Sequence, residues 1–71
     1  MINGLKSFLQ RHDLSQAWLA RRINMEPSTL ARKVAGNRPI TRDEINAILG
    51  VAQQLDPGAT YERLFSEVRY E

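Results

Sequence analysis

Apolar residues recur at the spacing of an α-helix in five successive segments of the chain. Steps of three and four residues separate the apolar positions between Ile2 and His12, which predicts an amphipathic first helix. Segments with the same period follow at about residues 15–23, 27–35, 42–55 and 60–68. An alternating pattern typical of a strand covers no more than the last few residues, 66–71. The pattern therefore predicts an all-α domain, a compact bundle of five helices.

Capping residues place the ends of these predicted helices. Ser15 is a good N-cap for the second helix, and Asn24 stands where a left-handed residue can end it. Pro27 suits the first position of the third helix, and Gly36 ends that helix. The stretch Thr41–Glu44 has the capping-box pattern, which predicts the start of the fourth helix.

The inner faces of the five predicted helices define an expected core. We expect Trp18 to lie half-exposed over its edge, with a partner surface as the alternative, and His12 to pack at a helix end. Gly50, in the middle of the fourth helix, should cost about 1 kcal/mol relative to Ala. The residues expected to face inward are Ile2, Leu5, Phe8, Leu9, Leu19, Ile23, Leu30, Val34, Ile45, Ile48, Leu49, Ala52, Leu55, Tyr61, Leu64, Phe65 and Val68.

Composition limits the kind of protein. A chain of 71 residues makes one domain, residues 1–71, with a modest core. It has no cysteine, so it forms neither a disulfide nor a thiolate metal site. A single histidine and the lack of a close carboxylate pair give no basis for a metal site, a cofactor or an enzyme activity. The longest apolar run, 47–52, is too short to span a membrane, and no signal-peptide pattern opens the chain. We therefore expect a cytoplasmic protein.

Charge is distributed unevenly along the chain. Residues 1–42 contain eight basic and two acidic side chains, whereas residues 43–71 contain two basic and six acidic ones. The first part therefore carries a net +6 and the second a net −4, although the whole chain is only +2. Such an asymmetry indicates either a basic face turned toward phosphate and an acidic face turned away, or simply an uneven solvated surface.

The third predicted helix has a short, basic outer face. On a helical wheel Leu30 and Val34 mark the buried side, and Ser28 and Arg32 lie opposite. Arg32 can donate two hydrogen bonds to O6 and N7 of a guanine in the DNA major groove, and Ser28 can reach a base or a phosphate. Lys33 flanks them. The alternative is an exposed helix whose charged side chains are only solvated.

Residues around this helix are further candidates for DNA contacts. Gln16 lies at the start of the second helix, where backbone N–H groups and the helix dipole favour a phosphate. Asn37 and Arg38 follow the third helix and can hold the sugar–phosphate backbone. The alternatives are an ordinary surface residue for Gln16 and a role in shaping the turn before Pro39 for the other two.

The segment from Leu14 to Ile45 resembles the lambda-repressor-like helix-turn-helix family, which includes phage Cro proteins and phage and bacterial repressors. The resemblance rests on Leu14-Ser15-Gln16, Leu19-Ala20 with Ile23, Ser28-Thr29-Leu30, Gly36-Asn37-Arg38-Pro39 and the box from Thr41 to Glu44. The chain departs from the family pattern at Asn24, which replaces a frequent turn glycine, and at Trp18, where many relatives have a polar residue. Pro27 replaces a residue that reaches a base in some relatives.

This resemblance implies a helix-turn-helix over about residues 15–35, with the third helix as the recognition helix. It also implies that the protein binds double-stranded operator DNA as a dimer and usually represses transcription. By position, Gln16, Thr29 and the loop Asn37-Arg38 would contact phosphate, whereas Ser28 and Arg32 would face bases. Pro27 would lie at the same surface.

We therefore expect a sequence-specific, dimeric regulator of transcription, a phage or prophage Cro-like repressor. The two copies would form a weak homodimer, completed on DNA, through the end of the fourth helix and the apolar residues Leu64, Phe65, Val68 and Tyr70. The alternative is that these side chains simply close the core of the single chain, which is the expectation for Leu64. One alternative is the DNA-binding antitoxin of a toxin–antitoxin pair. Another, from a different class, is a protein-interaction module that keeps the fold but has lost DNA binding.

Overall fold

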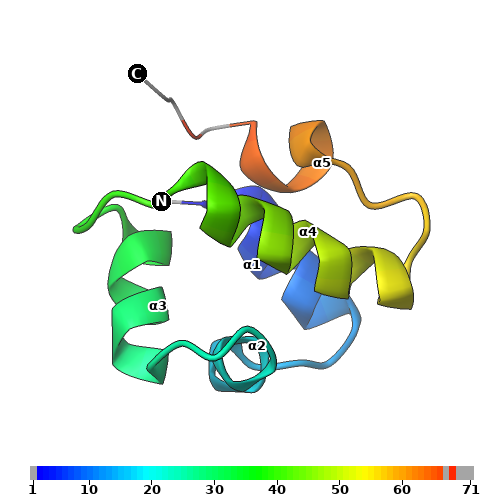
Figure 1. Ribbon diagram of the computed structural model, residues 1–71. Coiled ribbons are helices and arrows are strands. Elements are labelled where there is room, and N and C mark those ends of the chain that lie inside the picture. Colours follow the sequence, from blue (N-terminus) through cyan, green and yellow to red (C-terminus); the bar gives the residue numbers. More distant parts are fainter. Residues whose placement is uncertain (1, 67, 69–71) are drawn as a thin grey trace.

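Five helices follow one another in the computed structural model, which describes residues 2–66 and 68 (Figure 1). No strand occurs among these residues, and they extend over 27 × 23 × 19 Å. None of the helices within 2–66 is long and apolar enough to cross a membrane. The predicted all-α class is confirmed. The helices are α1 (Asn3–Arg11), α2 (Gln16–Arg22), α3 (Pro27–Ala35), α4 (Arg42–Leu55) and α5 (Tyr61–Phe65).

The helices begin at the capping residues that the sequence predicts. The hydroxyl of Ser15 accepts a hydrogen bond from the backbone N–H of Trp18 at 3.0 Å, which satisfies a free donor at the start of α2. Thr41 and Glu44 form the complete capping box of α4, since each side chain accepts a hydrogen bond from the other residue's backbone N–H, at 3.2 and 2.8 Å. The hydroxyl of Thr60 caps α5 in the same way as Ser15 caps α2.

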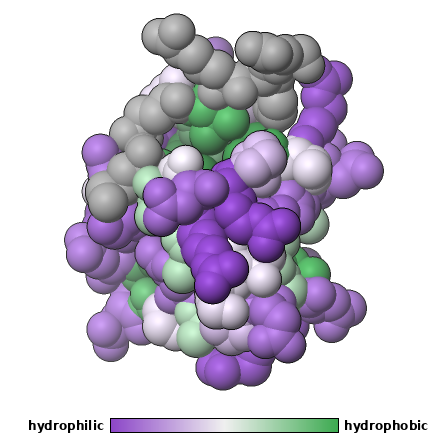
Figure 2. All heavy atoms as spheres, turned by 90° about the vertical axis from the view of Figure 1, so that its left-hand side faces the viewer, coloured by the Kyte–Doolittle hydropathy of each residue, from purple (hydrophilic) through white to green (hydrophobic). Residues whose placement is uncertain are grey.

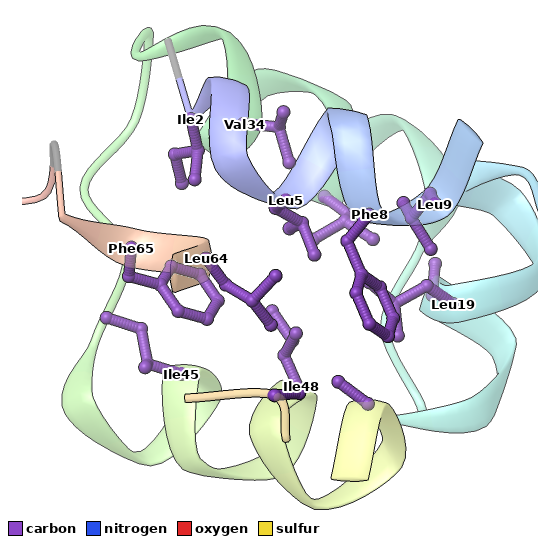
Figure 3. Close-up of a cluster of buried hydrophobic side chains, with 14 residues drawn as sticks. Ile2, Leu5, Phe8, Leu9, Leu19, Val34, Ile45, Ile48, Leu64 and Phe65 are labelled. Atoms are coloured by element: carbon purple, nitrogen blue, oxygen red, sulfur yellow. The ribbon is translucent and has the colours of Figure 1, made fainter. Parts of the chain in front are cut away.

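The core lies between the helices and contains only apolar side chains among the described residues. Figure 3 shows side chains from all five helices converging on one cluster, with Phe8 and Phe65 as its largest members. Because no polar or charged side chain among the described residues is buried, the core stabilises the fold through apolar burial and packing. The fully buried residues with the largest volumes are Phe65, Leu5, Leu19, Leu30, Ile45, Ile48, Leu64 and Val34.

Helix α5 packs so closely on the start of α1 that there is room only for glycine at position 4. A Cβ atom on Gly4 would lie 2.3 Å from the carbonyl oxygen of Arg63 and 2.9 Å from that of Leu64. This close approach lets the short helix α5 insert Leu64 and Phe65 into the core beside α1. The C-terminal helix is therefore part of the central packing.

Two backbone hydrogen bonds hold α1 to the segments that surround the candidate site. The N–H of Ile2 donates to the carbonyl of Val34 at 2.8 Å, which ties the start of the chain to the last turn of α3. The N–H of Leu14 donates to the carbonyl of Leu9, also at 2.8 Å, and fixes the turn into α2. The start of α1 is thus bonded to α3, and the end of α1 fixes the turn that leads into α2.

The fourth helix differs from its expected pattern at its end. Leu55, the last residue of α4, was expected to face inward, but 40% of it is exposed. Leu49 is only partly buried. His12 and Trp18 lie as expected: His12 ends α1 with its ring centroid 4.5 Å from that of Phe8, and Trp18 is half-buried at the edge of the core.

Candidate nucleic-acid interface

Helix α3 presents its short, polar side to solvent. Leu30 and Val34 are buried, whereas Ser28 and Arg32, on the opposite side, are exposed. Pro27, at the first position of the helix, is exposed as well. The side of the molecule that carries α3 and the loop after it is mostly hydrophilic (Figure 2). A convex helix with small and basic side chains on its outer face has the shape that fits the major groove of DNA.

A tight turn sets α3 against α2. Ile23 ends α2, and Asn24 adopts a left-handed conformation with φ of 58°, as expected of a residue at this position. The N–H of Met25 then donates to the carbonyl of Ala20 at 2.8 Å, and Glu26 precedes the first turn of α3. Glu26 makes no side-chain capping bond, so Pro27 and the buried face of α3 determine where the helix starts.

The loop after α3 leaves two of the predicted contact residues exposed. Gly36 ends the helix in a left-handed conformation with φ of 90°, which a side chain would disfavour. The N–H of Asn37 donates to the carbonyl of Arg32 at 2.9 Å, so the loop stays close to the last turn of α3. Asn37 and Arg38 are both exposed there. Gln16 and Thr29 are half-buried, and the structure keeps part of each side chain accessible.

Lys33 does not belong to this exposed surface. Its ammonium group forms an ion pair with the carboxylate of Glu44 on α4, and only 11% of the lysine side chain is exposed. The sequence placed Lys33 beside Arg32 as a DNA contact, and the structure corrects this. Lys33 lies on the flank of α3 that faces α4, so its ammonium group pairs with Glu44 and does not point toward the outer face of α3.

The carboxylate of Glu44 links α4 to the loop before it and to α3. One oxygen accepts from the backbone N–H of Thr41 in the capping box, and the other pairs with Lys33. Partial burial desolvates the carboxylate and raises its pKa, but the hydrogen bonds from Lys33 and from the backbone and side chain of Thr41, with the charge of Lys33, outweigh this effect. The pKa of Glu44 therefore lies below its usual value of 4.5.

The pair of Lys33 and Glu44 was not predicted from the sequence, although part of its signal is visible there. Glu44 was recognised as the fourth residue of the capping box, and Lys33 was known to lie on the flank of α3. Nothing in the spacing shows that the two flanks meet, since that depends on how the loop folds α4 back against α3. A second missed contact follows helical spacing: the guanidinium of Arg22 lies 5.3 Å from the ring centroid of Trp18, four residues earlier.

Two of the candidate dimer residues lie in the core of the single chain, which was the alternative prediction for them. Leu64 and Phe65 are buried in the core of the single chain, with 1% and 0% exposed, so they have no surface to offer to a second copy. Val68 is half-buried, and its carbonyl accepts a hydrogen bond from the hydroxyl of Tyr61 at 3.3 Å. Tyr70 lies outside the described residues.

The described residues bring no further chemistry together. Among residues 2–66 and 68 there is no group of three or more side chains that could hold a metal ion. Comparison with protein-family models, with curated proteins and with solved structures finds no match to this chain. The exposed face of α3 and its following loop therefore stand as the candidate site on their geometry and chemistry.

Proposed function

We propose that this protein is a sequence-specific DNA-binding regulator of transcription that reads operator DNA with the outer face of α3. One observation carries the proposal: α3 holds Ser28 and Arg32 outward on a helix whose opposite side is fully buried. Arg32 would read a guanine, and Ser28 a neighbouring base or phosphate. A rigid helix that presents such side chains is what direct readout requires.

The surroundings of α3 support the same proposal. Asn37 and Arg38 are exposed on the loop that follows the helix, where they would contact phosphates, as would Gln16 and Thr29. These residues all belong to the first 42 residues of the chain, which carry a net +6. A positive field on this part of the surface would attract the DNA backbone and orient the encounter.

The pair α2 and α3 would act as a helix-turn-helix of the lambda-repressor-like kind. The left-handed residue Asn24 and the direct packing of α2 on α3 support this interpretation. We further propose that two copies bind two half-sites, as a Cro-like repressor would in the cytoplasm. One recognition helix contacts only a few base pairs, which is too few for useful selectivity.

Binding to random duplex DNA at several salt concentrations tests the proposal. We expect a dissociation constant of about 10⁻⁴ to 10⁻⁶ M at physiological salt, with binding that weakens steeply as salt rises. Selection of bound fragments from random DNA would then give the operator. A chain that binds neither random nor selected DNA at low salt would instead be a protein-interaction module, and the proposal would be wrong.

An antitoxin differs from a Cro-like repressor in that it also binds a toxin. An antitoxin binds DNA in the same way but also forms a stable complex with a toxin encoded beside it. Co-expression with the neighbouring reading frame, followed by size-exclusion chromatography, distinguishes the two.

A further inference from the structure

The centre of the outer face of α4 is a glycine that the single chain does not need. A Cβ atom built on Gly50 would meet no atom within 4 Å, and Gly50 is not among the residues with positive φ. Glycine in the middle of a helix is destabilising relative to alanine. A glycine at such an open site leaves room for the close approach of another backbone from outside.

The face around Gly50 carries no charge. Asn46, Ala47, Gln53 and Gln54 are exposed beside Gly50, and none of the 18 charged side chains of the chain falls within residues 45–55. Figure 3 shows Ile45 and Ile48 of the same helix pointing into the core, so the uncharged side points away from it. Lack of charge is typical of the centre of a protein–protein interface and unsuited to DNA or an anionic membrane.

Apolar side chains extend this face on one flank. Trp18, Val51 and Leu55 lie together around a narrow apolar packing gap at the edge of the core, which side chains of α1 also line. Leu55 is the one large hydrophobic side chain among the described residues that is exposed, and Trp18 is half-buried. The guanidinium of Arg22 covers the indole ring and donates to the amide oxygen of Gln54 at 3.5 Å, so it borders this flank.

We propose that the outer face of α4, defined by Asn46, Ala47, Gly50, Gln53 and Gln54, is the contact surface for a second copy of this chain. The two α4 helices would cross antiparallel about a two-fold axis near Gly50. The role of this dimer rests on the proposed function, since a regulator that reads two half-sites needs two copies. The contact itself forms without DNA.

The charges at the two ends of α4 favour a second copy as the occupant. Asp43 is exposed at the N-terminal end of the face, and Arg22 lies at the C-terminal end through its bond to Gln54. In an antiparallel pair, the Asp43 end of each copy meets the Arg22 end of the other. The amides of Asn46 and Gln54 would also lie opposite each other, and the opposed helix dipoles would attract.

This contact leaves the DNA-binding surface open. In Figure 1, α4 lies in front of α1, whereas α3 lies at the left, apart from the middle of α4. One helix face is small compared with the about 1,200 Å² that stable interfaces bury in total. We therefore expect weak association, with a dissociation constant on the order of 100 μM.

Cross-linking of single-cysteine variants tests the position of the two-fold axis. The chain contains no cysteine, so Gly50→Cys introduces one thiol at the proposed axis, and Ser7→Cys places the matched control on the exposed side of α1. Two thiols on the axis can reach the 4.4–6.8 Å Cα separation, roughly, that a disulfide needs. We expect Gly50→Cys to dimerise about tenfold faster than Ser7→Cys under mild oxidation. Equal rates would overturn the proposal.

Sedimentation of the full chain without DNA provides the second measurement. Gly50→Ala should raise the thermal stability of the dilute monomer and yet weaken self-association, a combination that a purely structural role of Gly50 does not produce. Gly50→Glu should weaken it about tenfold or more, and Ser7→Glu should leave it unchanged. Wild-type chain that stays monomeric at millimolar concentration would contradict the interface.

Binding to random duplex DNA, measured on the same variants, keeps the two proposals separate. Gly50→Glu that loses self-association but keeps salt-dependent DNA binding supports both the interface and the function. Wild type that associates but never binds DNA would leave the interface standing and refute the DNA-binding function.

Discussion

Arg32 is the side chain that distinguishes reading of bases from simple attraction to phosphate. It is exposed on α3 directly opposite the buried Leu30 and Val34. Arg32→Ala should weaken binding to the selected operator by about 1–3 kcal/mol and change binding to random DNA far less, because a base contact is lost. Fluorescence anisotropy on both duplexes measures this.

Two control variants sharpen the interpretation of Arg32. Arg63→Ala removes the same charge from an exposed position on α5 and should leave both affinities nearly unchanged. Arg38→Ala should weaken binding to both duplexes and lower the salt slope by about one, as expected for a phosphate contact. An equal loss on both duplexes for Arg32→Ala would show that Arg32, too, contacts only phosphate.

Glu44 is a residue whose protonation should be visible in stability. Its folded pKa lies below 4.5, so the ionised form stabilises the fold; this contribution is complete above pH 4.5 and is lost as pH falls through the lower folded value. Glu44→Gln should reduce the free energy of unfolding by about 1 kcal/mol at neutral pH, since solvent screens this pair near the surface, and by much less in acid. Urea unfolding at a series of pH values gives both numbers.

Lys33→Met tests the cause of this shift. Without the ammonium group the pKa of Glu44 should rise, so the loss of stability should begin at higher pH than in the wild type. An unchanged pH profile would mean that Lys33 does not hold the carboxylate in its ionised form.

At the scale of the elements, the contact of α1 with α5 depends on the absence of a side chain at position 4. Gly4→Ala should destabilise the fold by about 1–3 kcal/mol, because the new Cβ would lie 2.3 Å from a backbone carbonyl. Gly50→Ala is the matched control: its Cβ meets no atom, so it should stabilise the dilute monomer by about 1 kcal/mol. Thermal melts of both variants would show opposite signs; equal shifts would contradict the close packing of α5 on α1.

The helix boundaries could be predicted from the sequence because they depend on local chemistry. Ser15, Thr41 and Thr60 cap the helices that the apolar period predicts, and Asn24 and Gly36 adopt the left-handed conformations expected after them. Each of these signals acts within one turn of the residue that carries it. The exposed positions of Ser28 and Arg32 followed from the period of α3 in the same way.

The remaining features depend on how helices meet and could not be obtained from local patterns. Lys33 was placed on the DNA surface because a helical wheel does not show that α4 returns beside α3. Leu64 and Phe65 fitted either the core or a dimer contact, because the sequence does not show that the absence of a side chain at Gly4 lets α5 pack directly on α1. The exposure of Leu55 likewise depends on where the core ends.

At the scale of the whole molecule, the proposed assembly predicts the spacing of the DNA half-sites. The described residues extend over 27 × 23 × 19 Å, so two copies side by side can span one helical turn of DNA, roughly 34 Å. Contact through α4 would leave the outer faces of both α3 helices uncovered. We expect a complex of two chains on a palindromic operator, with cooperative binding although the free chains associate weakly.

Changing the distance between half-sites tests this geometry. Inserting roughly five base pairs at the centre of the operator turns one half-site to the opposite side of the duplex and should abolish cooperativity without altering binding to a single half-site. Inserting a full turn places both half-sites on one side again but beyond the reach of the α4 contact, so cooperativity should not return. Gly50→Glu should bind the original operator as weakly as the wild type binds a single half-site. Sedimentation of a strict one-to-one complex at saturating protein would show instead that a single chain reads the whole site.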